Sequence, residues 1–307
     1  MDLEQTRKIL TSNLLEHLSW HLPRQRSNSL GNINEVYEYS LFPTGKLFRP
    51  LLVWAVAKDF AKEPDFSPNS NHALLASCVE FHHTYSLLHD DLPSMDNDTM
   101  RRGKPCSHLA YNEWKALLAG DGLLNCSYQT LSKIKSDRLP EIFKLMGGLL
   151  GTKGLIQGQV LDLSGEMTKD FASLLETHKL KTARLIQFSL VGSLLLVESN
   201  YRKFLDLFRL GHRLGIVFQL LDDLTELTDF NLSAHEKEVN PWFNFKDQSL
   251  KELTSGLKII QEILKKHRLS NLESVIRDYF KSVEKIKDKP LLLEIPTSLI
   301  FQYFRFD

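Results

Sequence analysis

Hydrophobic residues recur at three- and four-residue spacing along most of the chain. The first segment shows the pattern, with Ile9, Leu10, Leu14, Leu15 and Leu18 on one side of a helix. The same spacing predicts further helices over about 47–60, 72–91, 108–131, 139–163, 171–198, 200–228 and 249–283. The strict alternation of a β-strand is scarce. The pattern therefore predicts an all-α protein in which the helices form one bundle.

Turn signals separate these segments, but no linker long enough to divide two cores is present. We therefore expect residues 1–307 to form a single domain. The final stretch, from Asp288, contains two prolines and the aromatic residues Phe301, Tyr303, Phe304 and Phe306. Because these rings need burial, we expect this stretch to pack over the bundle or at a subunit contact.

Composition and charge narrow the possible functions. Of the 307 residues, 42% are hydrophobic and 25% are charged, and 38 basic side chains balance 38 acidic ones. This balance gives no broad basic surface for nucleic acid or anionic lipid. No apolar run reaches the roughly 18 residues of a membrane span. The three cysteines, Cys78, Cys106 and Cys126, lack paired metal-site spacing, so a reducing compartment, the cytoplasm, is expected.

An acidic segment stands out between residues 80 and 105. Asp90 and Asp91 end an apolar helical pattern, and Pro93 disfavours helical geometry at the residue before it. Asp96 can therefore fold back toward Asp90. Carboxylates that converge repel one another unless a cation joins them. Oxygen ligands suit Mg²⁺, and Arg101 and Arg102, which follow at once, suit phosphate.

A second acidic segment lies in FQLLDDLTELTDF, residues 218–230. Asp222, Glu226 and Asp229 stand at i, i+4 and i+7, so we expect them to share one helix face. The leucines between them would face the core, which places the acids at the rim of a central cavity. The alternative for either segment is a solvated acidic face. The paired arginines argue against that alternative for the first segment.

Two such segments on one helical bundle resemble the trans-prenyltransferases that make short isoprenyl diphosphates, the farnesyl and geranylgeranyl diphosphate synthase family. Residues 90–96, DDLPSMD, resemble the family's first aspartate-rich motif in its longer bacterial and plant form. Five further matches, one before this motif and four after it, keep the family's order and extend the resemblance from about residue 40 to residue 230. They are GKLFRP (45–50), LAGD (118–121), GQVLDL (158–163) with KT (181–182), and FQLLDD (218–223).

The resemblance implies the isoprenoid-synthase fold, a helical bundle around a central cavity, and it implies roles for single residues. Mg²⁺ would be held by Asp90, Asp91 and Asp96 on one side and by Asp222, Asp223 and Glu226 on the other. The allylic diphosphate would contact Arg101 and Lys181. Isopentenyl diphosphate would be held by Gly45, Lys46, Arg49, His83 and Arg102. The developing allylic cation would be stabilised by Thr182 and Gln219.

Product length is expected to depend on Tyr85 and the adjacent Ser86. Tyr85 stands five residues before Asp90, so its ring would point along the pocket and stop the growing chain. In bacterial members of the family, an aromatic residue here accompanies a C15 product, which favours farnesyl diphosphate. Tyr85 as an ordinary core residue, and a geranylgeranyl diphosphate synthase, are the alternatives.

The chain departs from the family pattern at several positions. Leu47 replaces an arginine, Gln157 replaces a glycine, and Glu226 replaces the last aspartate of the second motif. The family's following lysine-containing segment is not recognisable in residues 231–247. These changes lead to the hypothesis that the second metal site is weakened or rearranged.

The predicted function is the Mg²⁺-dependent condensation of isopentenyl diphosphate with an allylic diphosphate, by a homodimer. One rival is a terpene cyclase of the same fold, which would need no second diphosphate site. Lys46, Arg49 and Arg102 argue against it. Another rival is a weakly active or silent partner subunit, which the altered region 226–247 favours.

Overall fold

The computed structural model describes residues 2–22, 32–61, 63–284, 286–287 and 289–304. In the N-terminal half, the helices are α1 (Leu3–Ser19), α2 (Asn34–Leu41), α3 (Phe48–Phe60), α4 (Asn71–Asp90), α5 (Ser107–Ala110), α6 (Glu113–Leu131) and α7 (Leu139–Leu150). In the C-terminal half, they are α8 (Leu155–Leu163), α9 (Phe171–His178), α10 (Arg184–Leu195), α11 (Tyr201–Glu226), α12 (Ala234–Val239), α13 (Pro241–Asn244), α14 (Lys246–His267), α15 (Ser270–Glu284) and α16 (Thr297–Phe301).

Other regular structure in the described residues is short. One two-stranded antiparallel hairpin, β1 (Met100–Arg101) with β2 (Lys104–Pro105), follows the first acidic segment. A π-helical turn, η2 (Lys179–Ala183), joins α9 to α10, and single 3₁₀ turns lie at η1 (Glu166–Thr168) and η3 (Gln302–Phe304). The predicted all-α fold is therefore confirmed.

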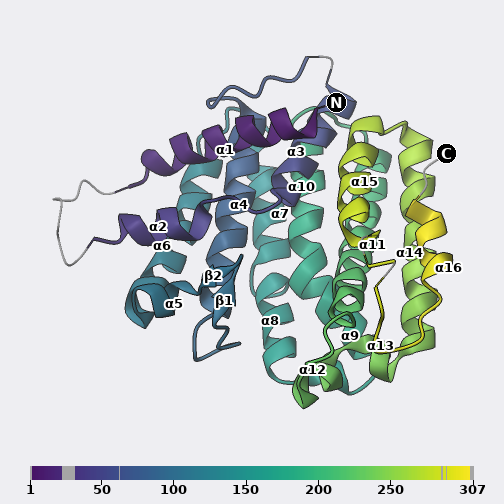
Figure 1. Cartoon of the computed structure of the whole chain (residues 1–307). Coiled ribbons are helices and arrows are strands. Elements are labelled where there is room, and N and C mark those ends of the chain that lie inside the picture. Colours follow the sequence, from purple (N-terminus) through teal and green to yellow (C-terminus); the bar gives the residue numbers. More distant parts are fainter. Residues whose placement is uncertain (1, 23–31, 62, 285, 288, 305–307) are drawn as a thin grey trace.

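The long helices run alongside one another, and α1 lies across the ends of α3 and α4 (Figure 1). Within the bundle, α4 packs against α3, α6 and α10, while α11 packs against α10, α14 and η2. In the ranges described, no helix combines the length and hydrophobicity needed to cross a bilayer.

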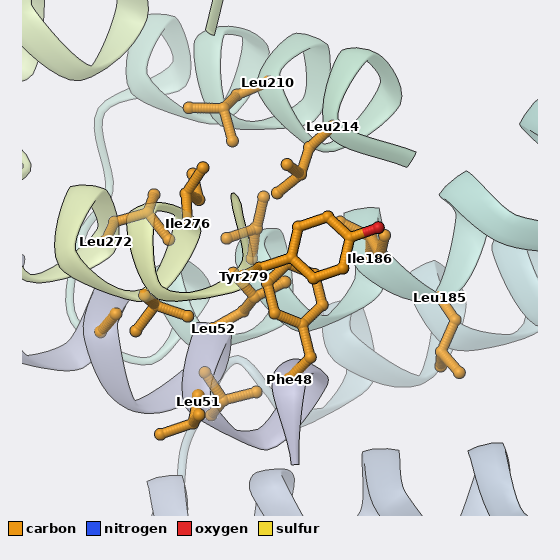
Figure 2. Close-up of a cluster of buried hydrophobic side chains, with 14 of the residues drawn as sticks. Phe48, Leu51, Leu52, Leu185, Ile186, Leu210, Leu214, Leu272, Ile276 and Tyr279 are labelled. Atoms are coloured by element: carbon orange, nitrogen blue, oxygen red, sulfur yellow. The ribbon is translucent and has the colours of Figure 1, made fainter. Parts of the chain in front are cut away.

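The centre of the bundle is built around α3. Residues 51–53 and 55–57 of this helix are at most 1% exposed, as expected for a helix that is hydrophobic on all sides. Figure 2 shows the first turns of α3 among side chains from α10, α11 and α15. The labelled residues are Phe48, Leu51, Leu52, Leu185, Ile186, Leu210, Leu214, Leu272, Ile276 and Tyr279.

Four predicted helices are divided in the structure. The segment 108–131 breaks at residues 111–112, between α5 and α6. The segment 139–163 breaks at Gly151–Gly154, where a Cβ on Gly154 would lie 1.8 Å from the Leu149 carbonyl oxygen. The segment 249–283 breaks at Arg268, whose φ of 54° ends α14. The segment 171–198 contains the turn η2. Hydrophobic spacing continues across each break, so the pattern does not predict these boundaries.

The C-terminal stretch packs over the bundle, as predicted. Ile300 and Phe301 of α16 are buried, and Tyr303 packs against the same core. The amide Nε2 of Gln261 in α14 donates to the Tyr303 carbonyl at 2.8 Å. The predicted burial of the Phe304 and Phe306 side chains falls outside the described residues.

Candidate active site

The first acidic segment begins where α4 ends. The backbone N–H of Asp96 donates to the Asp90 carbonyl at 2.9 Å, which confirms that the chain folds back after Pro93. The two aspartates thus lie close together at one end of the bundle. Burial, together with the negative charge of Asp96, raises the pKa of Asp90 to about 7, against the opposing charge of Lys181.

Asp91 points away from this pair. It is 4% exposed, and its Oδ1 accepts from Arg101 Nε at 2.9 Å and from Arg101 Nη2 at 2.5 Å. The same guanidinium reaches Asp98 at 2.6 Å. The hairpin β1–β2 places Arg101 here, because it turns the chain back just after the acidic segment. Asp91 therefore orients Arg101 in this structure and does not join Asp90 and Asp96.

Lys181 and Thr182 lie on the π-helical turn η2, which packs closely against α8. Gly158 of α8 makes this approach possible, because a Cβ there would lie 2.2 Å from the backbone nitrogen of Lys181. The Lys181 ammonium pairs with Asp162 of α8 and lies 3.9 Å from Asp96. Burial disfavours the charged form of Lys181. The negative charges of Asp162, Asp90 and Asp96 outweigh this effect and raise the pKa of Lys181. A π turn of this kind is frequent at functional sites.

A basic group lies farther along the bundle, at α3 and α4. Arg49 Nη1 donates to His83 Nε2 at 3.1 Å. Burial, and then the charge of Arg49, hold the pKa of His83 well below its usual range, so the imidazole is neutral. Glu80 is 3% exposed and lies 3.6 Å from Arg102 Nη2. Its carboxylate therefore balances part of the charge of Arg102 and Arg49.

Gly45 lies against the same group. A Cβ on Gly45 would come within 3.2–3.3 Å of the Arg102 guanidinium, so glycine lets the loop approach it. Lys46, the next residue, is exposed, and its Nζ donates to Ser282 Oγ of α15 at 3.1 Å. The residues expected to hold isopentenyl diphosphate therefore lie near one another, around the start of α3.

The second acidic segment ends α11. Asp222 and Glu226 are exposed, whereas Asp223 is 7% exposed and accepts from Gln219 Nε2 at 2.9 Å. Thr182 Oγ1 in turn donates to Gln219 Oε1 at 3.1 Å. The prediction that Asp229 shares the helix face is wrong, because α11 ends at Glu226 and Asp229 lies in the turn beyond it.

Asp222 faces the basic group of the site. Burial raises its pKa, and the positive charges of Lys46 and Arg49 oppose that rise. The second acidic segment is therefore electrostatically linked to the basic group across the site. Glu226 has a different partner, since its Oε2 accepts from Asn240 Nδ2 at 3.0 Å.

One cavity of about 410 Å³ is lined by members of the basic group and of the first acidic segment. Its polar wall includes Arg49, His83, Asp90, Lys181 and Thr182, which come from α3, α4 and η2. The rest of its lining is mostly apolar and includes Tyr85, Ser86, Leu124, Leu155 and Leu185. The cavity thus has basic and acidic side chains at one end and an apolar interior, which suits a ligand with a charged head and a hydrocarbon tail.

The donor set fits a hard cation such as Mg²⁺. Asp90 and Asp96 offer only oxygen atoms, and burial disfavours their ionised forms unless a positive charge joins them. Among the residues that the structure describes, no three His, Cys, Asp or Glu side chains are already assembled as a metal site. A cation at this end would therefore need a further oxygen ligand, such as a phosphate.

Sequence reasoning missed several residues that hold the site together. Asp162 pairs with Lys181, Glu80 lies between two arginines, and Asn240 holds Glu226. Asp162 lies in the matched motif GQVLDL, so the sequence could have indicated that it belongs to the site. Glu80 also had a signal, because a carboxylate on an apolar helix requires a buried partner. Asn240 had none, since its role depends on how α12 and α13 return to α11.

Comparisons with known proteins agree with this arrangement. The polyprenyl synthetase family model matches residues 31–287. A farnesyl diphosphate synthase of Geobacillus stearothermophilus is 34% identical over 209 residues, which cover 66% of this chain and 69% of that protein. A chloroplastic geranylgeranyl pyrophosphate synthase of Catharanthus roseus is 35% identical over 202 residues, covering 64% of this chain and 55% of that protein.

The likeness extends to solved structures. A geranyltransferase of Helicobacter pylori, in complex with magnesium and isoprenyl diphosphate, superposes with a TM-score of 0.71 at 27% identity. The superposition covers 89% of this chain and 97% of that one. The chain therefore belongs to the polyprenyl synthetase family, among its short-chain trans-prenyltransferases.

Proposed function

We propose that the protein condenses isopentenyl diphosphate with an allylic diphosphate, dimethylallyl or geranyl, to give a short-chain prenyl diphosphate. The observation that carries this proposal is a cavity with charged side chains at one end and an apolar interior. The two charged groups could bind two diphosphates, and the apolar part could receive the hydrocarbon tail.

The reaction begins when the allylic carbon–oxygen bond breaks and its electron pair leaves with diphosphate. Arg101 and Lys181 would hold that diphosphate and stabilise the charge that develops on it. Mg²⁺ held by Asp90 and Asp96 would add Lewis-acid stabilisation of the same leaving group. A requirement for Mg²⁺ is supported by the magnesium in the Helicobacter pylori geranyltransferase structure.

The second substrate would bind at the basic group. Lys46, Arg49 and Arg102 would hold the diphosphate of isopentenyl diphosphate, with His83 beside them as a neutral hydrogen-bond donor. The double bond attacks the allylic cation, and transfer of a proton to the departing diphosphate leaves an allylic diphosphate that is five carbons longer. Thr182 and Gln219, already hydrogen-bonded at 3.1 Å, would lie beside that cation.

We propose a C15 product, because Tyr85 and Ser86 line the cavity. Tyr85 is 7% exposed, and its ring packs edge-on against the His82 ring with centroids 4.6 Å apart. These contacts hold the Tyr85 ring in place at the cavity wall. Relatives include both farnesyl and geranylgeranyl diphosphate synthases, which leaves a C20 product as the alternative.

The proposal is tested by measuring diphosphate release from an allylic diphosphate, with and without isopentenyl diphosphate. A prenyltransferase releases diphosphate only when both substrates are present, and it needs Mg²⁺. A terpene cyclase on this fold would release it from the allylic substrate alone. Release that does not depend on isopentenyl diphosphate would therefore overturn the proposal.

A silent partner subunit is the second candidate, and the contact between Asn240 and Glu226 favours it. This hydrogen bond at 3.0 Å engages a carboxylate that the second metal site would use. If the protein is a silent partner subunit, the variant Asp90→Ala would leave its biological role intact. If the protein is a catalyst, the same variant abolishes its role together with turnover.

We also propose that the chain forms one domain and assembles as a homodimer through α6. This helix exposes Trp114, Leu117 and Leu118, with exposed fractions of 51%, 45% and 48%, and Tyr128 lies farther along it. A row of large apolar side chains on one helix is typical of a surface that packs against a partner.

A further inference from the structure

The loop that carries Lys46 is linked by hydrogen bonds to α1 and, through α1, to α15. Arg7 of α1 donates from Nε to the Lys46 carbonyl at 3.3 Å. The Nη2 of the same side chain pairs with Asp278 Oδ2 of α15 at 2.5 Å. Arg7 therefore links the loop to α15, although none of the sequence motifs includes Arg7 or Asp278.

The loop needs this support. Leu47 has a φ of 51°, in the left-handed region that leucine rarely adopts, so its surroundings must impose the conformation. The side chain of Leu47 is buried, but Lys46 is exposed. On that side the loop borders a cavity of about 240 Å³, whose lining includes Arg7, Lys46, Asp278 and Ser282. Because packing is incomplete there, polar contacts must fix the Lys46 backbone.

The ammonium group of Lys46 is directed by the same elements. Its Nζ donates to Ser282 Oγ at 3.1 Å and lies 5.7 Å from the centroid of the Tyr279 ring. The Tyr279 ring packs against Phe48, the first residue of α3, with centroids 5.2 Å apart (Figure 2). The backbone and the side chain of Lys46 are thus both held from α15, and Arg7 supplies the link to the backbone.

We propose that Arg7 is a positioning residue, which holds the Lys46 backbone so that the lysine can bind the diphosphate of isopentenyl diphosphate. This inference rests on the proposed function, in which Lys46 binds that substrate. A lysine is a point charge on a flexible stem, so the position of its backbone decides where the charge can reach. Arg7 acts through this backbone contact and does not itself touch substrate.

The test is calorimetric binding of isopentenyl diphosphate to the full chain without divalent metal. Arg7→Met should weaken binding about 5- to 20-fold, the range expected for loss of a charge-assisted hydrogen bond. Lys8→Met is the matched control, because Lys8 is the next residue, has a side chain that is 76% exposed and pairs only along the helix with Glu4 at 3.2 Å. It should leave affinity unchanged.

Asp278→Asn separates positioning from a general charge effect. Removing a negative charge near an anion site would strengthen diphosphate binding if charge alone mattered. Positioning predicts the opposite, about two- to fivefold weaker binding, because Arg7 loses its anchor on α15. This variant also keeps the test decisive if Arg7→Met does not fold.

A double variant shows whether Arg7 acts through Lys46. In the background Lys46→Met, Arg7→Met should change affinity by less than about twofold, since residues that act as one unit are not additive. If the unmodified protein does not bind isopentenyl diphosphate, the proposed site fails and the inference fails with it. If it binds, and neither Arg7→Met nor Asp278→Asn weakens binding, the inference alone is overturned.

Discussion

Tyr85 forms part of the wall of the cavity beyond the charged residues. It lies one and a half turns of α4 before Asp90, and both residues line the same cavity. His82 and His89 flank its ring at centroid distances of 4.6 and 5.8 Å. A growing hydrocarbon tail that enters between the charged residues would therefore meet a ring that cannot easily move aside.

Tyr85→Ala should lengthen the product. Removing the ring deepens the cavity, so we expect C20 to replace C15 as the main product, while the rate of the first condensation changes by less than about tenfold. Chromatography of the dephosphorylated products measures this directly. Tyr201→Ala, at a side chain on α11 that is 70% exposed, is the control and should keep C15. Unchanged product length in a folded Tyr85→Ala protein would show that Tyr85 is only a core residue.

At the scale of single residues, the sequence predicts local geometry better than it predicts partners. The return of Asp96 toward Asp90 follows from Pro93, which acts on its immediate neighbours. The pairing of Asp91 with Arg101 depends on the hairpin that follows, so spacing alone could not indicate it. The link from Arg7 to Asp278 joins residues 271 positions apart, and no local pattern contains it.

At the scale of elements, the contact between α8 and η2 is critical, because η2 carries Lys181 and Thr182. Gly158 allows the two backbones to approach, and Asp162 on the same helix pairs with Lys181. The position of the lysine is therefore set by helix packing as well as by its own ion pair.

Gly158→Ala should lower both stability and turnover. The added Cβ would lie 2.2 Å from a backbone nitrogen, so the helices must separate, at a cost of about 1–3 kcal/mol. Gly147→Ala on α7 is the matched control. A Cβ added there would meet no atom within 4 Å outside its own stretch of helix, so this variant should stabilise the helix by about 0.5–1 kcal/mol. Chemical unfolding and kcat measure the two effects. Equal stabilities for the two variants would contradict the close packing.

The segment α12–α13 changes the surroundings of the second acidic group. Asn240 is 2% exposed and donates to the Asp223 carbonyl at 2.8 Å and to Glu226. Trp242, fully buried, donates from Nε1 to the Leu220 carbonyl at 2.9 Å. This segment is therefore firmly attached to the end of α11.

Glu226→Asp tests whether this attachment alters metal use. Aspartate is one methylene shorter and would release the Asn240 amide, so its carboxylate would be free to bind metal. We expect the Mg²⁺ concentration for half-maximal rate to fall about two- to tenfold, in line with one oxygen ligand gained. Asn240→Ala should shift it in the same direction. No change in rate or in Mg²⁺ dependence for either variant would contradict the hypothesis of a rearranged second site.

Hydrophobic spacing could predict which parts of the chain are helical, but it could not predict where every helix begins and ends. The helices α3, α4 and α11 match their predicted ranges to within about two residues, because their apolar stripes end with the helix. The divisions at Gly151–Gly154, η2 and Arg268 leave the stripe intact, so they depend on tertiary packing. The short α2, α12 and α13 have too few residues for a periodic signal.

At the scale of the whole molecule, the exposed apolar side chains of α6 predict a dimer. Sedimentation should find the protein as a dimer at micromolar concentration, and the double variant Leu117→Glu with Leu118→Glu should raise the dissociation constant more than about tenfold. Leu205→Glu, on α11 and similarly exposed at 51%, should leave the dimer intact. A monomeric unmodified protein would contradict this assignment.

The most direct test of the central claim is incorporation of labelled isopentenyl diphosphate, with Mg²⁺ and, separately, C5, C10 and C15 allylic diphosphates. Product length is then read by chromatography. We predict incorporation with the C5 and C10 primers, accumulation of C15, and almost none with the C15 primer, because one cavity binds both diphosphates and Tyr85 limits the tail. A folded protein that incorporates no label with any primer would contradict the claim that this cavity is a prenyltransferase active site.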